Sequence, residues 1–309
     1  SDIFQVSYGY GLFTGGLGAH AGAENIGASV IPMSSGNTEK QITLMHDFGS
    51  TVLCCTPSYA LYLADAIKDS GLPREEFKLK VGAFGAEPWT EQMRHEIEEK
   101  LGIKAYDIYG LSEIAGPGVG YECECQHGTH LNEDHYFPEI IDPNTLQPVE
   151  PGQTGELVFT HLTKEGMPLL RYRTRDLTAL HHDKCSCGRT LVRMDRILGR
   201  SDDMLIIRGV NVFPTQIEEV LLKIDEIGPH YEILVERKNR LDVMTITVEL
   251  IDDRLLDSYA KLSELETRIK SALKSQLGLA TCIRLVAPNS LRRFEGKAKR
   301  VTDLRKDGL

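Results

Sequence analysis

The sequence predicts an α/β domain that carries a small β subdomain and is followed by a separate α+β module. Three observations support this prediction. Short apolar runs alternate with helical patterns through the first third of the chain, loops with prolines dominate from about Gly118, and regular alternation returns after Gly199. Because alternating strands and helices are typical of a mainly parallel sheet covered by helices, we expect domains at residues 1–199 and 200–309, with the small subdomain at 118–199.

The first domain opens with a glycine-rich stretch from Tyr8 to Gly36, where glycines permit sharp turns and close backbone approach. Apolar runs after it predict strands, and amphipathic runs predict helices. Pro88-Trp89-Thr90 precedes the last of these helices. The predicted strands are residues 28–33, 51–55, 79–84 and 104–108, and the predicted helices are residues 39–48, 58–70 and 90–101.

The rest of the chain divides into a loop-rich part and a second regular part. Prolines between residues 138 and 151 separate short predicted strands at 156–161 and 176–181. This spacing is typical of a small β subdomain. The C-terminal module has predicted strands at 204–207, 231–236, 243–250 and 283–286, and predicted helices at 214–223 and 262–277.

The composition limits the classes of function. Of the 309 residues, 41% are hydrophobic and 26% charged, and the net charge is 35 − 45 = −10. This acidic balance argues against general nucleic-acid binding. No apolar run approaches the roughly 20 residues that span a bilayer, and the start of the sequence lacks the basic-then-apolar pattern of a secretory signal. We therefore expect a cytoplasmic protein that binds neither nucleic acid nor membrane.

One motif, Tyr109-Gly110-Leu111-Ser112-Glu113, directly follows a predicted strand. Turns at the carboxyl ends of strands are where open α/β sheets bind ligands. There an aromatic face can stack on a base, and a carboxylate can hold Mg²⁺ beside phosphates. An ordinary strand-to-loop turn would explain the same residues, so the motif alone leaves both interpretations open.

Three later segments also combine charges with glycine or aromatic residues. In the segment from Tyr172 to Asp176, the carboxylate suits two ribose hydroxyls, although a salt-bridged strand entry fits equally well. Gly199-Arg200-Ser201-Asp202-Asp203 suits a hinge with a phosphate-binding arginine, or a plain linker. The segment from Phe294 to Arg300 presents Lys297 on a loop containing glycine, which suits a reach into a distant site or a solvated basic edge.

The order of these motifs resembles the adenylate-forming superfamily, and in detail the chain resembles the phenylacetate–CoA ligase family over essentially its whole length. The stretch from Tyr10 to Gly18 is similar to a segment near that family's aryl pocket. Other matching segments are Thr56-Pro57-Ser58-Tyr59, Gly85-Ala86-Glu87-Pro88-Trp89, Glu133-Asp134-His135 and Pro138-Glu139-Ile140. The resemblance implies ATP-dependent ligation of a phenylacetate-like aryl acid to coenzyme A through an acyl-AMP intermediate, and a mobile C-terminal lid.

The resemblance also implies a nucleotide site. Tyr109 would stack on adenine, Asp107 would contact the adenine amino group, and Asp176 would hold the ribose hydroxyls. Glu113 would bind Mg²⁺, which neutralises phosphate charge during acyl transfer. The other nucleotide-binding candidates that it implies are Gly85, Ala86, Glu87, Gly110 and Ser112.

In the C-terminal domain, the resemblance makes Arg200 a phosphate contact, Asp202 the hinge, and Lys297 the lysine that enters the site for adenylation. Gly209 matches a glycine that leaves room for the pantetheine arm of coenzyme A. Lys297, Glu113 and Arg200 are thus the candidate catalytic residues. For the acid itself, Tyr8, Phe13 and Ala86 are candidates for an aryl pocket, although aromatic residues often belong simply to the core.

Four of the seven cysteines form two Cys-x-Cys pairs, Cys123/Cys125 and Cys185/Cys187, which together suit a tetrahedral structural zinc site. Some relatives in the resembled family carry a similar pattern, in which Cys123, His130, Cys185 and Cys187 look like the ligands. Cys125 is an additional candidate, so we expect four of these five residues to bind. Reduced thiols without a metal are the alternative, and Cys54, Cys55 and Cys282 are expected in the core.

A phosphate loop rich in Ser, Thr and Gly, which the resembled family carries in a preceding segment, has no match in this sequence. We therefore expect a fragment of the complete ligase that begins inside the large domain. A non-catalytic nucleotide- or CoA-binding subunit that needs a partner chain is the main alternative, and a zinc-stabilised scaffold is a third. The family resemblance also makes a homodimer an expectation.

Overall fold

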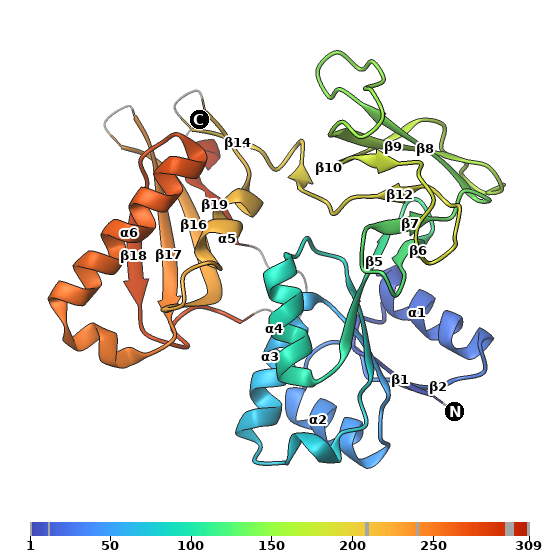
Figure 1. Ribbon diagram of the computed structural model, residues 1–309, viewed down its shortest axis with the longest axis horizontal. Helices are drawn as coiled ribbons and strands as arrows, with labels where there is room; N and C mark the ends of the chain where they lie inside the picture. The colour runs from blue at the N-terminus through green and yellow to red at the C-terminus, as the bar shows by residue number, and fades with distance from the viewer. Residues whose placement is uncertain (1, 12, 208–209, 239–240, 294–299, 308–309) are drawn as a thin grey trace. The chain divides into compact units, whose positions relative to one another are not determined.

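The computed structural model describes residues 2–11, 13–207, 210–238, 241–293 and 300–307 (Figure 1). The described residues form two compact units, one that ends at Leu198 and one that begins at Gly199. The predicted fold class, an α/β part with a small β part and a following α+β part, is confirmed. None of the described helices is both long and apolar enough to cross a bilayer.

Five parallel strands form one half of a nine-stranded sheet in the first unit. The central strand β3 is buried along its whole length, as expected for a parallel strand that is covered on both faces. The strands of this half, in sheet order, are β5 (Lys104–Leu111), β4 (Val81–Gly85), β3 (Val52–Cys55), β1 (Ile3–Val6) and β2 (Ser29–Pro32).

The helices that connect these strands begin and end where the sequence provides caps. Thr56 accepts a hydrogen bond from the Tyr59 amide, and Thr90 accepts one from the Met93 amide, at the starts of α3 and α4. Helix α4 ends at Gly102, whose φ of 58° is left-handed. The helices are α1 (Thr14–Asn25), α2 (Thr38–Asp47), α3 (Pro57–Asp69) and α4 (Glu91–Leu101), with a 3₁₀ turn η1 at Arg74–Glu76.

Helix α1 lies in the glycine-rich stretch, where we predicted no helix. Its glycines allow close packing that a side chain would prevent. A Cβ on Gly16 would lie 2.6 Å from the carbonyl oxygen of Gly9, and one on Gly18 would collide with the ring of Pro117. Because glycine disfavours an isolated helix, the packing of α1 against neighbouring strands must supply its stability.

Four short antiparallel strands form the other half of the large sheet. They continue from β5 in the order β6, β7, β12, β11. We expected this part of the chain to be loop-rich and to build only the small subdomain, but these strands extend the large sheet instead. Their bounds are β6 (Gly116–Glu122), β7 (Thr129–Leu131), β12 (Arg193–Met194) and β11 (Leu180–His181).

A separate antiparallel sheet in the first unit contains β8, β9 and β10. The strand predicted at residues 176–181 is divided in two, because the chain passes at Ala179 from β10 in this sheet to β11 in the large one. Both sheets contribute to one core, in which Leu131 packs with Phe159. The bounds are β8 (Tyr136–Ile141), β9 (Gly155–His161) and β10 (Tyr172–Thr178).

The second unit is an α+β module around a four-stranded sheet in the order β18, β17, β16, β19. Helix α6 packs on it through Leu265, Ile269, Leu273 and Leu277, which recur every four residues. Its elements are β13 (Gly199–Arg200), β14 (Leu205–Ile207), β15 (Val210–Val212), α5 (Pro214–Leu221), β16 (Ile227–Lys238), β17 (Leu241–Leu250), η2 (Asp253–Asp257), α6 (Tyr259–Leu277), β18 (Cys282–Val286), β19 (Val301–Asp303) and η3 (Leu304–Asp307).

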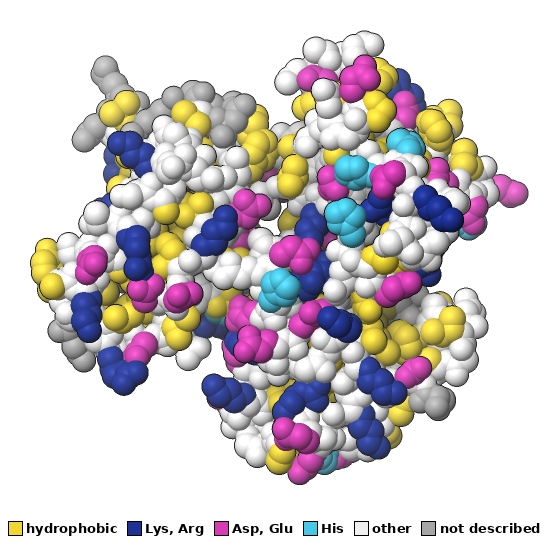
Figure 2. Space-filling view, viewed as in Figure 1, with side chains coloured by type: hydrophobic (Ala, Val, Ile, Leu, Met, Phe, Trp, Pro, Cys, Tyr) yellow, Lys and Arg dark blue, Asp and Glu magenta, His cyan; other side chains and the backbone are white. Residues whose placement is uncertain are grey.

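One cysteine expected in the core is at the surface. Cys54 and Cys55 are buried in β3, but Cys282 is exposed. The reason is that Cys282 begins β18, an edge strand whose residues alternate between inward and outward positions. On the face drawn in Figure 2, basic and acidic side chains are interspersed over both units.

Candidate functional site

The motif Tyr109–Glu113 lies at the end of β5, but the strand continues further than predicted. Tyr109, Gly110 and Leu111 still belong to β5, because β6 returns antiparallel and pairs with them after an irregularity at Gly110. A Cβ at Gly110 would collide with the carbonyl oxygen of Gly116, so this crossing requires glycine. The turn therefore begins only at Ser112, and its Oγ lies 3.2 Å from Thr14 Oγ1 at the start of α1.

Glu113, the expected magnesium ligand, is held from the small sheet. The hydroxyl of Tyr172 on β10 donates a hydrogen bond of 2.7 Å to Glu113 Oε1. Lys164 Nζ donates to the main-chain carbonyls of Glu113 (3.1 Å) and Ile114 (3.2 Å). His161 Nε2 donates to the Ile114 carbonyl at 2.9 Å, while its Nδ1 accepts from an amide, which defines the tautomer. The turn is thus fixed before any ligand binds.

Asp176, the expected ribose ligand, lies on β10 and is buried. Tyr109 Oη donates a hydrogen bond of 2.6 Å to Asp176 Oδ2, so the expected adenine-stacking ring and the expected ribose carboxylate are in direct contact. Arg173, the second residue of β10, makes a bidentate ion pair with Glu156 at 2.7 Å. The segment from Tyr172 to Asp176 is therefore both a salt-bridged strand and a source of site residues.

The segment Gly85-Ala86-Glu87 leaves β4 beside β5. Ala86 has a φ of 69°, a left-handed conformation that is uncommon for a residue with a side chain. Glu87 Oε1 accepts a hydrogen bond of 2.7 Å from the Ser58 amide at the start of α3. Such strain outside glycine is often found at binding sites, where the surrounding structure maintains it.

Asp107, the expected adenine contact, lies in β5 among other charges. Burial, and then repulsion by Glu122, raise the pKa of the Asp107 carboxyl to about 7, although Trp89, Arg196 and Arg94 oppose the shift. Its amide donates to Glu122 Oε2 at 2.7 Å. A carboxyl group with such a perturbed pKa is typical of a functional site.

The expected aryl-pocket residues lie near this group. Tyr8 is buried, and its ring centroid lies 6.3 Å from that of Phe13, which is 42% exposed. Burial raises the pKa of Tyr8 well above its ordinary value, and the negative charges of Asp107 and Glu87 contribute to the shift. Aryl-pocket and nucleotide candidates therefore share one region of the first unit.

In the second unit, Arg200 makes two hydrogen bonds of 2.8 Å to the carboxylate of Asp202, so the expected phosphate contact is held by the expected hinge residue. Asp203 lies 3.7 Å from the same guanidinium. Lys297 and Gly209, expected to serve adenylation and pantetheine binding, lie outside the described residues.

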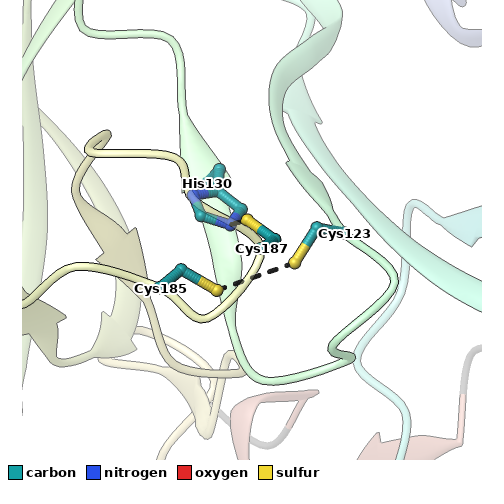
Figure 3. Close-up of side chains that lie close together, drawn as sticks. All are labelled: Cys123, His130, Cys185 and Cys187. Carbon is teal, nitrogen blue, oxygen red and sulfur yellow. Dashed lines mark hydrogen bonds between the residues drawn. The ribbon is translucent and has the colours of Figure 1, made fainter.

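The cysteine and histidine candidates converge in the antiparallel half of the large sheet. Cys123 follows β6, His130 lies on β7, and Cys185 and Cys187 lie in the loop between β11 and β12 (Figure 3). The ligand atoms of these four residues all lie within 4.8 Å of one another. Cys125 is not among them, and its Sγ lies 3.1 Å from Ser186 Oγ.

Two distances within this cluster match tetrahedral zinc. With bonds of about 2.3 Å to sulfur and 2.0–2.1 Å to nitrogen, tetrahedral geometry requires sulfur atoms about 3.8 Å apart and sulfur and nitrogen about 3.6 Å apart. Cys123 Sγ and Cys185 Sγ are 3.8 Å apart, and Cys187 Sγ and His130 Nε2 are 3.6 Å apart. Hydrogen bonds from the backbone and side chain of Arg189 help to lower the pKa of Cys187 to about 7, whereas burial raises that of Cys123 to about 12. A bound cation would hold both as thiolates.

Some residues of this site were not predicted from the sequence. Tyr172, Lys164 and His161 hold the Glu113 turn, but they lie about 50 to 60 positions along the chain from it. Tyr172 stands inside a segment that we had singled out for its charges, and an aromatic residue beside a cluster of charges was the available signal. Glu122 directly precedes the ligand candidate Cys123, which was the signal for its position.

Comparisons with known proteins agree with this arrangement. A family model described as AMP-binding enzyme matches residues 13–162, and one described as AMP-binding enzyme C-terminal domain matches residues 209–305. The chain is 50% identical to a phenylacetate–coenzyme A ligase of Thermus thermophilus over 97% of this chain and 71% of that protein. It is 51% identical to the protein of that name from Escherichia coli, over 98% and 69% respectively.

A solved structure has a similar fold. It is a 2-hydroxyisobutyryl-CoA ligase in the postadenylation state, in complex with an adenylate. The match has a TM-score of 0.91 at 31% identity, and it covers 99% of this chain and 66% of that one.

Proposed function

Because this chain belongs to the phenylacetate–coenzyme A ligase family, we propose that it serves the ATP-dependent ligation of an aryl carboxylic acid to coenzyme A. The members are AMP-forming acid–thiol ligases, so the resemblance predicted from the ordered motifs is confirmed. In the proposed reaction, the acid's carboxylate oxygen attacks the α-phosphorus of ATP and pyrophosphate leaves. The thiol of coenzyme A then attacks the acyl carbon and AMP leaves.

The observation that carries this proposal is the contact between Tyr109 and Asp176 at the end of β5. The hydrogen bond of 2.6 Å sets an aromatic face beside a buried carboxylate, which suits a nucleoside whose base stacks and whose ribose is held. Asp107, on the same strand, would accept from the adenine amino group. Gly85, Ala86 and Glu87 would wall the base and the acyl group, with Gly110 and Ser112 lining the turn.

Glu113 would hold Mg²⁺ beside the phosphates, and the ion would neutralise charge there. Tyr172 and Lys164 orient this carboxylate and its turn, so that no rearrangement is needed when the nucleotide binds. In the second unit, Arg200 would leave Asp202 for the nucleotide phosphate as the hinge moves. Lys297 would enter for adenylation, and Gly209 would leave room for pantetheine.

We propose phenylacetate or a similar aryl acid as the substrate, with Tyr8, Phe13 and Ala86 lining the pocket, and degradation of aromatic acids as the setting. The ring pair of Tyr8 and Phe13 supports this assignment because an aromatic acid can pack edge-to-face against such rings. Phenylacetate should outcompete acetate in AMP formation by the complete protein. Equal use of acetate would remove the aryl assignment.

We propose that Cys123, His130, Cys185 and Cys187 bind a structural zinc ion, because four protein ligands leave no position for a reacting water. Metal analysis of protein prepared without a histidine tag should find about one zinc per chain. Less than about 0.2 per chain would show that the thiols carry no metal.

Acid-dependent exchange between ATP and pyrophosphate tests the function. We expect exchange with aryl acids when the chain is joined to the remaining part of a relative, because it spans 71% and 69% of the two relatives described above. If neither this chain alone nor the joined form catalyses exchange, but AMP still binds, a non-catalytic nucleotide- or CoA-binding subunit would be supported instead.

We also propose a homodimer and a cytoplasmic location. The cysteine-rich cluster of metal-ligand candidates suits a reducing compartment.

A further inference from the structure

Strand β5 has main-chain groups that no neighbouring strand pairs. On one side it pairs with β4 from Lys104, but on the other side β6 pairs with it only from Ile108. The amide and carbonyl of Ala105 and the amide of Asp107 point to that unpaired side. Buried main-chain groups must find other partners, and here four side chains supply them. We call these four, Arg94, Glu98, Glu122 and Gln126, the β5 clamp.

Arg94 and Glu122 form the buried half of the clamp. Arg94 Nη2 donates to Glu122 Oε1 at 2.7 Å and Nη1 donates to Oε2 at 2.8 Å, and each side chain is 2% exposed. Glu122 Oε2 also accepts from the Asp107 amide at 2.7 Å. Arg94 in addition donates to the Ala105 carbonyl, and its guanidinium lies 4.8 Å from the centroid of the Trp89 ring. One carboxylate thus joins α4 to Asp107, which lies two residues before the Tyr109–Glu113 motif.

Gln126 and Glu98 form the other half of the clamp. Gln126 Nε2 donates to the Ala105 carbonyl and to Glu98 Oε1, both at 2.9 Å. Glu98 Oε1 in turn accepts from the Ala105 amide at 3.0 Å. Both polar groups of Ala105 are therefore bonded by side chains, two residues before Asp107.

Half of the clamp comes from the segment that carries the proposed zinc ligand Cys123. Glu122 immediately precedes this ligand, and the amide of Gln126 donates to the Cys123 carbonyl at 3.0 Å. Gln126 has a left-handed φ of 48°, which directs the chain back toward β5. A metal ion on Cys123 would therefore fix both clamp residues of this segment.

We propose that the β5 clamp, anchored by the metal ligand Cys123, positions Asp107 so that the site selects adenine by its amino group. This inference rests on the proposed function, because it assumes that Asp107 faces the base. Glu122, Arg94, Glu98 and Gln126 are positioning residues, since they hold β5 and do not reach the nucleotide. The metal cluster then serves base selection as well as stability.

The test compares AMP with inosine monophosphate, which carries a carbonyl in place of the amino group. Both share the ribose and the phosphate, so their ratio of dissociation constants reports on recognition of the edge of the base that carries the amino group. The titrations use the 309-residue chain in a calorimeter. In Glu122→Gln, one of the two accepting oxygens is replaced by an NH₂ group. This group then faces a donor, either the Arg94 guanidinium or the main-chain amide of Asp107, so at least one hydrogen bond is lost. We expect the preference for AMP to fall about fivefold or more, since a hydrogen bond to a charged group is lost.

Two further variants keep the test decisive if Glu122→Gln fails to fold. Gln126→Asn keeps a residue that tolerates left-handed φ but is too short to reach Ala105, and it should also lower the preference for AMP. Glu156→Gln is the matched control, because Glu156 also makes a buried bidentate pair with an arginine, at 2.7 Å. Glu156 lies on β9, which pairs with β10, the strand that carries the expected ribose ligand Asp176. Its substitution should therefore change the affinities for both nucleotides alike and leave their ratio unaltered.

The role of Cys123 as an anchor is tested by removing zinc with a chelator. Emission spectrometry then measures the remaining metal content. We expect the stripped chain to bind AMP with reduced preference over inosine monophosphate. An unchanged ratio in the stripped chain would overturn the role of Cys123. An unchanged ratio in folded Glu122→Gln or Gln126→Asn, or an equal loss of preference in Glu156→Gln, would overturn the clamp. If the unaltered chain bound neither nucleotide, the proposed function itself would fall.

Discussion

The parallel and antiparallel halves of the nine-stranded sheet are stabilised by different interactions. In the parallel half, apolar side chains such as Leu53 and Phe84 are completely buried. In the antiparallel half, β7, β11 and β12 have only two or three residues each. There the buried groups include the Arg94–Glu122 pair and a cluster of metal-ligand candidates. The expected adenine contact lies on β5, where the two halves join, so its position depends on both kinds of interaction.

This difference teaches that short strands can extend a sheet when polar interactions supplement the apolar core that they share with the small sheet. Each short strand adds only a few apolar side chains to that core, so burial alone stabilises it weakly. Charge pairs and a metal can do so, but they depend on every member being present. The antiparallel half should therefore respond sharply to the loss of one group, whereas the parallel half should respond in proportion to the buried volume that is removed.

The largest effect is expected from Cys187→Ser. Loss of one of four ligands should abolish zinc binding and release β7 and β12, because binding free energies of structural zinc reach about 10–16 kcal/mol in small domains. Zinc content and the melting temperature measure the change. Hydrogen exchange should quicken at β7 and β12 while the amides of β3 stay protected. Cys125→Ser is the matched control and should keep its zinc, and loss of metal in both variants would contradict the assigned ligand set.

A smaller effect is expected from Arg94→Met. The substitution leaves Glu122 buried without its cation, so the free energy of unfolding should fall by about 3–5 kcal/mol. The double variant Arg94→Met with Glu122→Leu removes both charges and should cost less than the sum of the two single variants. Urea unfolding of the two single variants and the double variant, monitored in the first unit, measures the three free energies. Additive costs would show that the two side chains do not interact as the geometry indicates.

Leu53→Ala makes the corresponding test in the parallel half. Leu53 is completely buried, so truncation should lower the free energy of unfolding by about 3 kcal/mol through lost burial and a cavity. The loss should be the same with and without a chelator, because the proposed zinc ligands lie in the antiparallel half of the sheet and its connecting loops. A cost that depends on zinc would show that the two halves do not differ as proposed.

The parallel half was predictable from the sequence because its elements have strong local signals. Apolar runs such as Val52–Cys55 predict buried strands, and Thr90 and Gly102 bound a helix that forms where expected. Helix α1 was missed because its glycines disfavour a helix locally, and only contacts with distant residues such as Pro117 explain it. Strands β7 and β12 were missed for a related reason, since two or three residues carry no periodic pattern.

The same distinction applies to the candidate site. Residues inside contiguous motifs, such as Tyr109, Glu113 and Asp176, could be named as candidates from the sequence and its family resemblance. Their partners could not, because the bond from Tyr172 to Glu113 joins positions 59 residues apart. Likewise, the spacing alone did not distinguish Cys123 from Cys125 as a metal ligand. In the structure, the thiol of Cys123 lies in the cluster, whereas that of Cys125 lies beside Ser186.

An effect that depends on pH is expected from Asp107→Asn, measured without nucleotide. Burial, and then the charge of Glu122, raise the pKa of Asp107 to about 7, whereas an unfolded chain has an aspartate pKa near about 3.9. Between these values the native protein binds a proton that the unfolded chain has released, so this group makes stability fall as the pH rises through that window. Asparagine does not titrate, so the stability of the variant does not fall through this group as the pH rises.

The melting temperature of Asp107→Asn should therefore be close to that of the unaltered chain at pH 4, exceed it increasingly as the pH approaches 7, and show a constant gap above about pH 8. Asp142→Asn provides a control of opposite sign, because backbone amides of Thr145 and Asn144 lower the pKa of that exposed carboxyl. Its variant should lose stability relative to the unaltered chain above about pH 4. A gap for Asp107→Asn that is independent of pH would mean that the carboxyl at the junction of the two halves is not held among the charges of Glu122, Arg94 and Arg196.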